Sequence, residues 1–144
     1  MPDAGAHTIG VSHCSSFTNR LYNFNTTVQT DPSLDPYYAN LVLKAQCPKG
    51  DYRNSQTTVP MESKTSLILD NLYYDEVKAH RGLFTSDAAL LTDPNTLNIV
   101  NQNSGIDMIA WHKKFTAAMV KMGQIGVLTG SQGEIRVNCR CTNN

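Results

Sequence analysis

The residues best suited to chemistry lie near the start of the chain, where His7 and Thr8 are adjacent and Cys14 follows. We expect one helix over residues 7–20. On that helix His7 and His13 point about 240° apart, so they cannot share one metal ion. His7 and Cys14 share a face but lie about 10 Å apart, whereas zinc needs every ligand within about 2.3 Å. A single imidazole on a helix suits haem, whose macrocycle supplies four further bonds. A histidine buried in the core is the alternative.

Composition limits the class of protein. The 144 residues suffice for one domain with a real core, and the formal net charge is zero. Without a basic cluster, binding to nucleic acid or to an anionic membrane has no electrostatic support. No apolar run approaches the roughly 20 residues of a membrane span, and the first residues lack the pattern of a signal peptide. We therefore expect no nucleic-acid partner and no membrane partner.

Helical signals recur along the chain. We expect helices from Asp35 to Cys47-Pro48, over residues 70–80, from a Ser86 cap to Leu91, over residues 93–101 and over residues 107–122. Residues 48–64 are expected to be irregular, and residues 128–139 form a turn followed by an extended segment. One face of the helix over residues 107–122 is apolar, and we expect it to be buried in the core. Its side chains are Trp111, Phe115, Ala118, Met119 and Met122. The sequence therefore predicts an all-α protein.

Four cysteines allow three disulfide connectivities, and none lies in a C-x-x-C pair. A zinc-binding interaction module therefore has little support. Asn25-Thr26-Thr27 is an acceptor sequon for N-glycosylation, which agrees weakly with a secreted protein.

Several segments together resemble the secretory plant (class III) haem peroxidases. They are Gly-Ala-His-Thr through Arg-Leu-Tyr-Asn-Phe at 5–24, Asp-Pro-Ser-Leu-Asp-Pro-Tyr-Tyr-Ala at 31–39 with Cys47-Pro48, Thr65 to Tyr74, and Leu128 to Cys139. The resemblance covers essentially the whole chain apart from residues 1–4 and 48–60. It implies the C-terminal, proximal half of the haem peroxidase fold, with residues 1–144 as one truncated domain and the distal half absent. It also implies a secreted or vacuolar location.

The resemblance assigns roles to individual residues. It implies that His7 binds the iron of haem b and that Asp87 takes the other imidazole proton, which makes the ring more electron-donating. Asp87 could instead cap a helix beside Ser86. The resemblance also selects a Cys14–Cys47 disulfide, which would stabilise the fold by about 4 kcal/mol and imply an oxidising compartment.

A calcium site is the second assignment that the resemblance makes. Thr8, Thr65, Ile68 and Asp70 would supply hydroxyl, carbonyl and carboxylate oxygens, which calcium accepts together. Glu62 stands where the family has an aspartate, and its longer arm could weaken or alter the site. Asp70 also resembles an ordinary helix cap.

By resemblance, the function is oxidation of small phenolic donors by hydrogen peroxide, with a part in the removal of peroxide under oxidative stress. The family's distal histidine and arginine have no counterpart here, and His13, His80 and His112 are expected to lie at the surface. Cys139 matches a cysteine whose partner is missing, and Met1-Pro2-Asp3 replaces an aliphatic helix. We therefore expect a truncated, monomeric product that is inactive alone. The alternative is a non-catalytic, disulfide-held helical remnant that binds haem or calcium weakly.

Overall fold

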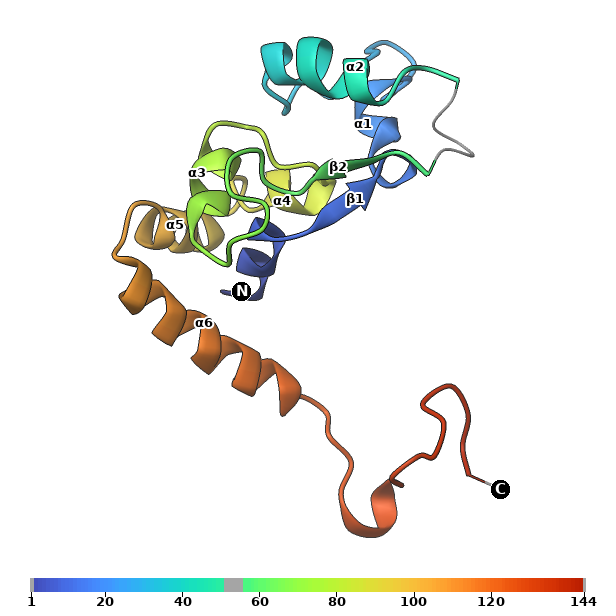
Figure 1. Ribbon diagram of the computed structural model, residues 1–144, viewed down its shortest axis with the longest axis vertical. Coiled ribbons are helices and arrows are strands. Elements are labelled where there is room, and N and C mark those ends of the chain that lie inside the picture. Colours follow the sequence, from blue (N-terminus) through green and yellow to red (C-terminus); the bar gives the residue numbers. More distant parts are fainter. Residues whose placement is uncertain (1, 51–55, 144) are drawn as a thin grey trace.

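The computed structural model describes residues 2–50 and 56–143. Its α-helices are α1 (Thr18–Leu21), α2 (Lys44–Gln46), α3 (Leu72–Lys78), α4 (Thr85–Ala89), α5 (Pro94–Asn103) and α6 (Met108–Gly123). The 3-10 helices are η1 (Pro2–Thr8), η2 (Cys14–Ser16) and η4 (Gly130–Gln132), and η3 (Tyr38–Leu43) is a π-helix. The described strands are β1 (Val11–His13) and β2 (Thr58–Pro60). Helices dominate, which confirms the all-α prediction (Figure 1).

The single helix expected over residues 7–20 is wrong. The chain leaves η1 at Thr8, passes through Gly10 at φ 96°, and enters β1, which pairs antiparallel with β2. The left-handed backbone at Gly10 cannot continue a right-handed helix, and the β-branched Val11 suits a strand. His7, His13 and Cys14 therefore lie on different elements, and the helical spacing argument does not apply to them. Residues 58–60 of the segment expected to be irregular form β2, whereas residues 51–55 lie outside the described residues.

Three expected helix starts are confirmed by their caps. The carboxylate of Asp35 accepts a hydrogen bond from the amide of Tyr38 at 2.7 Å. Asp93 accepts from the amides of Asn95 and Thr96 at the start of α5, where Pro94 needs no backbone partner. Asp107 accepts from Ala110 at the start of α6. Each aspartate satisfies amide groups that the first turn of a helix leaves unpaired.

The Ser86 cap is wrong, because α4 begins at Thr85 with Phe84 as its N-cap residue. The side chain of Asp87, at the third helical position, reaches back to the amide of Phe84 at 2.8 Å. That bond places the carboxylate at the buried start of the helix and satisfies an amide that would otherwise be unpaired.

The buried face expected for α6 is only partly correct. Trp111 and Ala118 are buried and Phe115 stacks on Trp111, but Met119 and Met122 are 37% and 43% exposed. The first turns of α6 pack on η1, and the rest of the helix leads away from the compact body into the tail at residues 124–143 (Figure 1). No described helix is both long enough and apolar enough to span a membrane.

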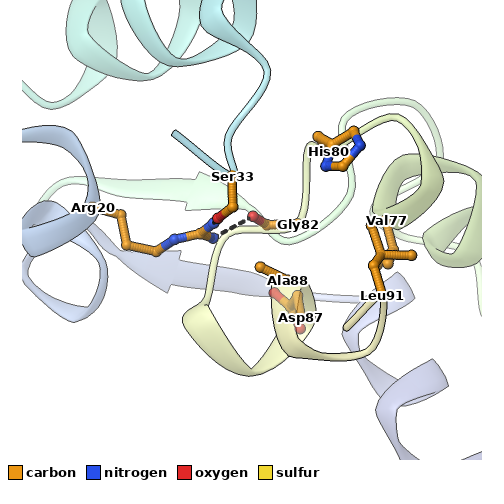
Figure 2. Close-up of a pocket in the computed structure, with 8 residues that line it drawn as sticks. All are labelled: Arg20, Ser33, Val77, His80, Gly82, Asp87, Ala88 and Leu91. Carbon is orange, nitrogen blue, oxygen red and sulfur yellow. Dashed lines mark hydrogen bonds between the residues drawn. The ribbon is translucent and has the colours of Figure 1, made fainter. Parts of the chain in front are cut away.

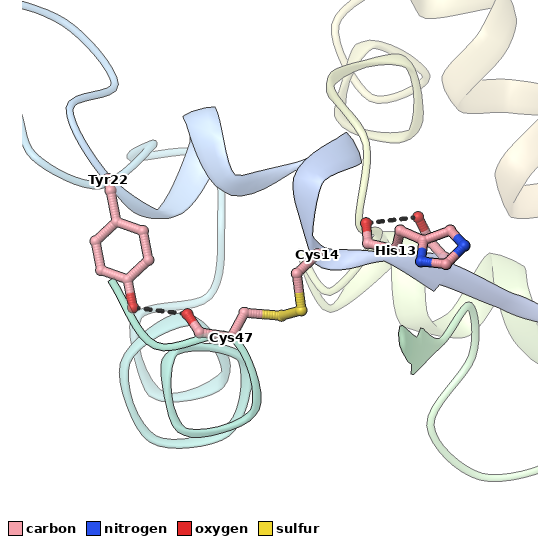
Figure 3. The surroundings of a disulfide bond; sticks show 5 residues. His13, Cys14, Tyr22 and Cys47 are labelled. Carbon is pink, nitrogen blue, oxygen red and sulfur yellow. Dashed lines mark hydrogen bonds between the residues drawn. A yellow bond between two sulfur atoms is a disulfide. The ribbon is translucent and has the colours of Figure 1, made fainter. Parts of the chain in front are cut away.

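Two hydrophobic clusters form the core. The first surrounds the disulfide and the second joins α3, α5 and α6, with Tyr73, Tyr74, Val77, Leu90, Val100 and Trp111 as its buried members. Cys14 and Cys47 are bonded, which is the pairing that the resemblance implied. Figure 3 shows the hydroxyl of Tyr22 donating to the carbonyl of Cys47 beside this bond, at 2.9 Å. The disulfide therefore ties the end of β1 to the end of α2.

We predict that the double variant Cys14→Ser/Cys47→Ser is much less stable than the wild type. The bond spans a sequence separation of 33 residues, and closing such a loop in the unfolded chain is worth about 4 kcal/mol. Urea unfolding followed by circular dichroism measures the difference. The matched control is Cys139→Ser/Cys141→Ser, because both thiols are free and exposed. Equal midpoints for the two double variants would contradict the prediction.

Candidate functional site

The centre of the candidate site is a contact between His7 and Asp87, which lie 80 residues apart in the chain. Nδ1 of His7 and Oδ1 of Asp87 are 2.9 Å apart. The Asp87 side chain is 2% exposed, whereas that of His7 is 36% exposed. Because a carboxylate only accepts hydrogen bonds, Nδ1 carries the proton of this contact, and in the neutral form of the ring Nε2 is the nitrogen with the lone pair. Within the described residues Nε2 makes no hydrogen bond, so it is available to an electron-pair acceptor.

Two further donors fix the Asp87 carboxylate. The hydroxyl of Tyr73 donates to Oδ1 at 2.8 Å, and the amide of Phe84 donates to Oδ2 at 2.8 Å. Burial and the negative charge of Asp87 raise the pKa of Tyr73, which keeps its phenol protonated and able to donate. Asp87 therefore serves both as a helix cap and as the imidazole partner, two roles that the sequence had left as alternatives.

Aromatic rings set the orientation of the imidazole. The rings of Tyr73 and Phe84 both meet that of His7 edge to face, at centroid distances of 5.8 and 5.3 Å. Such contacts restrict rotation of the ring about its side-chain bonds. The imidazole is thus held from α3, from the start of α4 and from the Asp87 carboxylate at once.

Gly82 allows the segment before α4 to approach Asp87. A Cβ atom at this buried position would lie 2.5 Å from the Cβ of Asp87, closer than real Cβ atoms come to other atoms. The cavity beside it is small, about 10 Å³, and is lined by Gly82, Asp87 and Arg20 among others (Figure 2). Any side chain at position 82 would therefore displace either this segment or the carboxylate.

Arg20 holds the same segment and is a residue that sequence reasoning missed. It is 1% exposed, and its Nη1 donates to the carbonyls of residues 82, 83 and 84 at 2.8 to 2.9 Å. Its Nε donates to Asp31 at 2.7 Å. Although burial opposes the change, hydrogen bonds from Ser33 and Arg20 lower the pKa of Asp31. The available signal was an arginine three residues after Phe17 and directly before Leu21, among apolar side chains where a charge needs a buried partner.

The candidate calcium ligands form two pairs in the structure. Thr8 Oγ1 donates to Asp70 Oδ1 at 2.8 Å. This carboxylate oxygen of Asp70 also accepts from the amide of Leu72 at 2.9 Å. Glu62 instead closes its own loop: Oε1 accepts from the amide of Lys64 at 2.6 Å, and Oε2 accepts from the amide and hydroxyl of Thr65.

Backbone bonds bring these two pairs near each other. Gly10, two residues after Thr8, donates to Ser66 and accepts from Met61, which flanks Glu62. The exposed Ile68 donates its amide to the Thr65 carbonyl. No hydrogen bond joins one pair to the other within the described residues, where no group of three or more histidine, cysteine or acidic side chains could hold a metal ion.

Buried charge distinguishes these two carboxylates from the rest. Glu62 and Asp70 are 1% and 4% exposed, yet they form no ion pair with a described basic side chain. The other carboxylates buried to this degree do contact one, in the pairs Asp31–Arg20, Glu76–Arg81 and Asp87–His7. Hydroxyl and amide donors hold these two carboxylates in place of a basic side chain, and their oxygens are of the kind that a hard cation binds.

The other histidines lie apart from this arrangement. His13 and His80 are exposed, as expected. The surface location expected for His112 is wrong, because its ring is half-buried and Nε2 lies 2.7 Å from the carbonyl oxygen of Leu69. Packing of α6 beside residue 69 creates this contact, and no local sequence pattern reveals it.

Comparison with known proteins identifies the family. The family model described as peroxidase matches residues 4–105. Grape (Vitis vinifera) Peroxidase 5 is 56% identical over 140 residues, which cover 97% of this chain. The chain belongs to the peroxidase family. Peroxidase 3 and Peroxidase 24 of Arabidopsis thaliana are 44% and 47% identical, again over 97% of this chain.

The peroxidase chain spans about two fifths of the curated relatives that it matches. The matched segment covers 42% of the grape relative and of Arabidopsis Peroxidase 3, and 40% of Peroxidase 24. The match to the family model includes His7, Asp87 and the loop at residues 62–70. The part of the chain that matches the family model therefore contains the candidate site.

We predict that Gly82→Ala in this peroxidase destabilises the fold by about 1–3 kcal/mol, because the added methyl group must displace packed atoms. Chemical denaturation measures the loss. The nitrogen NMR shifts of the His7 imidazole should change with it, because the Asp87 contact is disturbed. The control is Gly123→Ala at the end of α6, where an added Cβ meets nothing within 4 Å. A Gly82→Ala protein with wild-type stability and unchanged imidazole shifts would contradict the prediction.

Proposed function

We propose that this chain forms the iron-binding side of a haem peroxidase and that His7 Nε2 is the iron ligand. The complete protein would use hydrogen peroxide to oxidise small phenolic donors, removing peroxide under oxidative stress, and would be secreted or vacuolar. The observation that carries the proposal is the partly exposed His7 imidazole, which has one nitrogen held by buried Asp87 and the other without a hydrogen bond to the described residues. A histidine that donates its second ring proton to a carboxylate is the arrangement expected of a metal ligand.

The residues present fit haem at this position. When bound, haem would supply the iron that exchanges electrons with peroxide and with donors. Asp87 would accept the Nδ1 proton, fix the tautomer and increase the electron donation of the imidazole. Hydrogen bonds from the Tyr73 hydroxyl and the Phe84 amide would keep the carboxylate in place. The aromatic rings of Tyr73 and Phe84 would keep the imidazole from turning. The protein's part is therefore to orient and polarise one nitrogen.

We propose that the 144-residue chain, tested alone, is a poor catalyst. Moving a proton between the two oxygens of peroxide requires a positioned base. Among the other histidines, His13 and His80 are exposed and His112 contacts the Leu69 carbonyl. We propose a monomer, and the zero net charge gives binding to nucleic acid no electrostatic support.

We predict that haemin titrated into the purified chain gives a saturable Soret band that depends on His7. His7→Ala should abolish the specific band, and Asp87→Asn should weaken haemin affinity by about ten- to hundred-fold because the imidazole loses its anionic partner. His13→Ala is the matched control, since His13 is exposed and lies outside the site. Phenol oxidation by peroxide, measured on the same samples, should stay near the rate of free haemin.

Identical spectra for wild type and His7→Ala would refute the iron-ligand assignment. That result would favour the alternative, a non-catalytic chain held by its disulfide that binds haem or calcium only weakly. Efficient turnover by the chain alone would refute the proposed need for a further base.

We also propose that calcium binds the loop at residues 62–70 beside Thr8. Hydroxyl and carboxylate oxygens of Thr8, Thr65 and Asp70 and the carbonyl of Ile68 are the hard donors that calcium takes. Glu62 would join them by turning from the amides that it now accepts from. The support is the pair of buried carboxylates, Glu62 and Asp70, that form no ion pair with a basic side chain in the part of the chain that the structure describes.

We predict that calcium raises the thermal unfolding midpoint of the chain and that a chelator lowers it. A ligand present at a hundred times its dissociation constant adds about 2.7 kcal/mol to stability. Asp70→Asn should lose most of this response. The control is Asp93→Asn, because Asp93 likewise accepts from backbone amides near a helix start but is exposed and distant in sequence from the loop. Equal calcium responses in the two variants would contradict the site.

A further inference from the structure

The start of α6 contacts both of the segments that would supply the proposed calcium ligands. Thr8 lies on η1 and Asp70 lies at the end of the loop at residues 62–70, and a hydrogen bond joins their side chains at 2.8 Å. We propose that His112 of α6 is a positioning residue for this loop and that calcium binding is coupled to the docking of α6. The inference rests on the calcium site proposed above and is independent of haem.

Trp111 connects α6 to the Thr8 side of the site. Its side chain is 1% exposed and lies against η1 at Gly5, where an added Cβ atom would be 3.0 Å from Cζ2 of the indole. The same Cβ atom would lie 2.8 Å from the hydroxyl oxygen of Tyr74 on α3. The missing side chain at Gly5 therefore allows η1 to pack closely on α6 just before the chain reaches Thr8.

His112, the next residue, connects α6 to the Asp70 side. Its Nε2 lies 2.7 Å from the carbonyl oxygen of Leu69. Because a carbonyl oxygen only accepts hydrogen bonds, Nε2 carries the proton of this contact and donates it. Leu69 directly precedes Asp70, and one planar peptide group contains the Leu69 carbonyl and the Asp70 nitrogen. The bond therefore fixes the plane of the peptide that leads into Asp70.

Asn71 attaches the other side of Asp70 to the same region. Its Nδ2 donates to the carbonyl of Asn103 at 2.8 Å and to that of Ile106 at 3.0 Å. Asn103 ends α5, and Ile106 lies in the connection to α6. Asp70 thus lies between two residues that are bonded to α6 or to the segment before it. Movement of α6 away from the body would break the His112 bond and release one of the two attachments.

These attachments make calcium binding and helix docking mutually favourable. Trp111 and His112 are adjacent on α6, so the docked helix sets the separation between η1 and the loop. Thr8 and Asp70 are then already in place for the ion, and less entropy is lost on binding. Since a coupling free energy is reciprocal, calcium strengthens the docking of α6 by the same factor.

The test compares two substitutions of His112 by isothermal titration of calcium into the purified chain. His112→Phe keeps a ring but has no donor, and we expect about two- to ten-fold weaker affinity, the effect of losing one hydrogen bond. His112→Gln has an amide that can donate to the Leu69 carbonyl, so its affinity should stay near that of the wild type. Lys113→Ala is the matched control, because Lys113 is exposed on the same helix.

Hydrogen–deuterium exchange supplies a second readout. Calcium should slow exchange of the backbone amides in the first turns of α6 in the wild type and in His112→Gln, and less so in His112→Phe. The wild-type comparison needs no variant to fold. Equal exchange of α6 with and without bound calcium would overturn the coupling by itself.

Wild-type affinity in His112→Phe would also overturn the inference. So would a loss of affinity in His112→Gln alone, because that order would assign the effect to packing of the ring beside Trp111, whose centroid is 5.3 Å away. Each of these results leaves the calcium site itself standing. A wild-type chain that binds no calcium would refute the site together with the inference, so the two failures are distinguishable.

Discussion

The arrangement around His7 depends on one buried carboxylate. Asp87 accepts from the imidazole of η1, the phenol of α3 and the backbone amide at the start of α4, so three separate elements converge on two oxygen atoms. A buried charge is tolerated only when it is hydrogen-bonded and partnered, and here every partner also has a positional role. Removing the carboxylate would release the imidazole and uncap α4 together.

Arg20 and Gly82 make that position possible. The guanidinium of Arg20 draws three consecutive carbonyls toward it, and the missing side chain at Gly82 lets the same segment pass against Asp87. The disulfide fixes the end of β1, a few residues before Arg20 in the chain, to the end of α2. The buried carboxylates differ in their partners. Asp31 pairs with Arg20 and Asp87 with His7, whereas Glu62 and Asp70 form no ion pair with a described basic side chain. This last imbalance is the physical ground for proposing a cation there.

Local signals predicted the elements that are set locally. Asp35, Asp93 and Asp107 marked helix starts because a side-chain oxygen beside unpaired amides acts within one turn of chain. The helix expected over residues 7–20 failed because a strand at residues 58–60 pairs with Val11–His13, and propensity cannot anticipate a distant partner. The apolar face of α6 led us to expect Met119 and Met122 in the core, but both are exposed. An apolar face in the sequence does not specify which turns of a helix pack against another element.

The sequence by itself determined the family, the helical class and the caps at Asp35, Asp93 and Asp107, because side-chain chemistry and short-range hydrogen bonding are encoded within a few positions. It also named the residues that we propose as ligands of iron and calcium. Only the tertiary structure decided that His7 meets Asp87 across 80 residues, that Arg20 supports the segment before α4, and that Glu62 closes its own loop. Those contacts depend on how strands, the disulfide and the core bring remote segments together, and no spacing along the chain specifies that geometry.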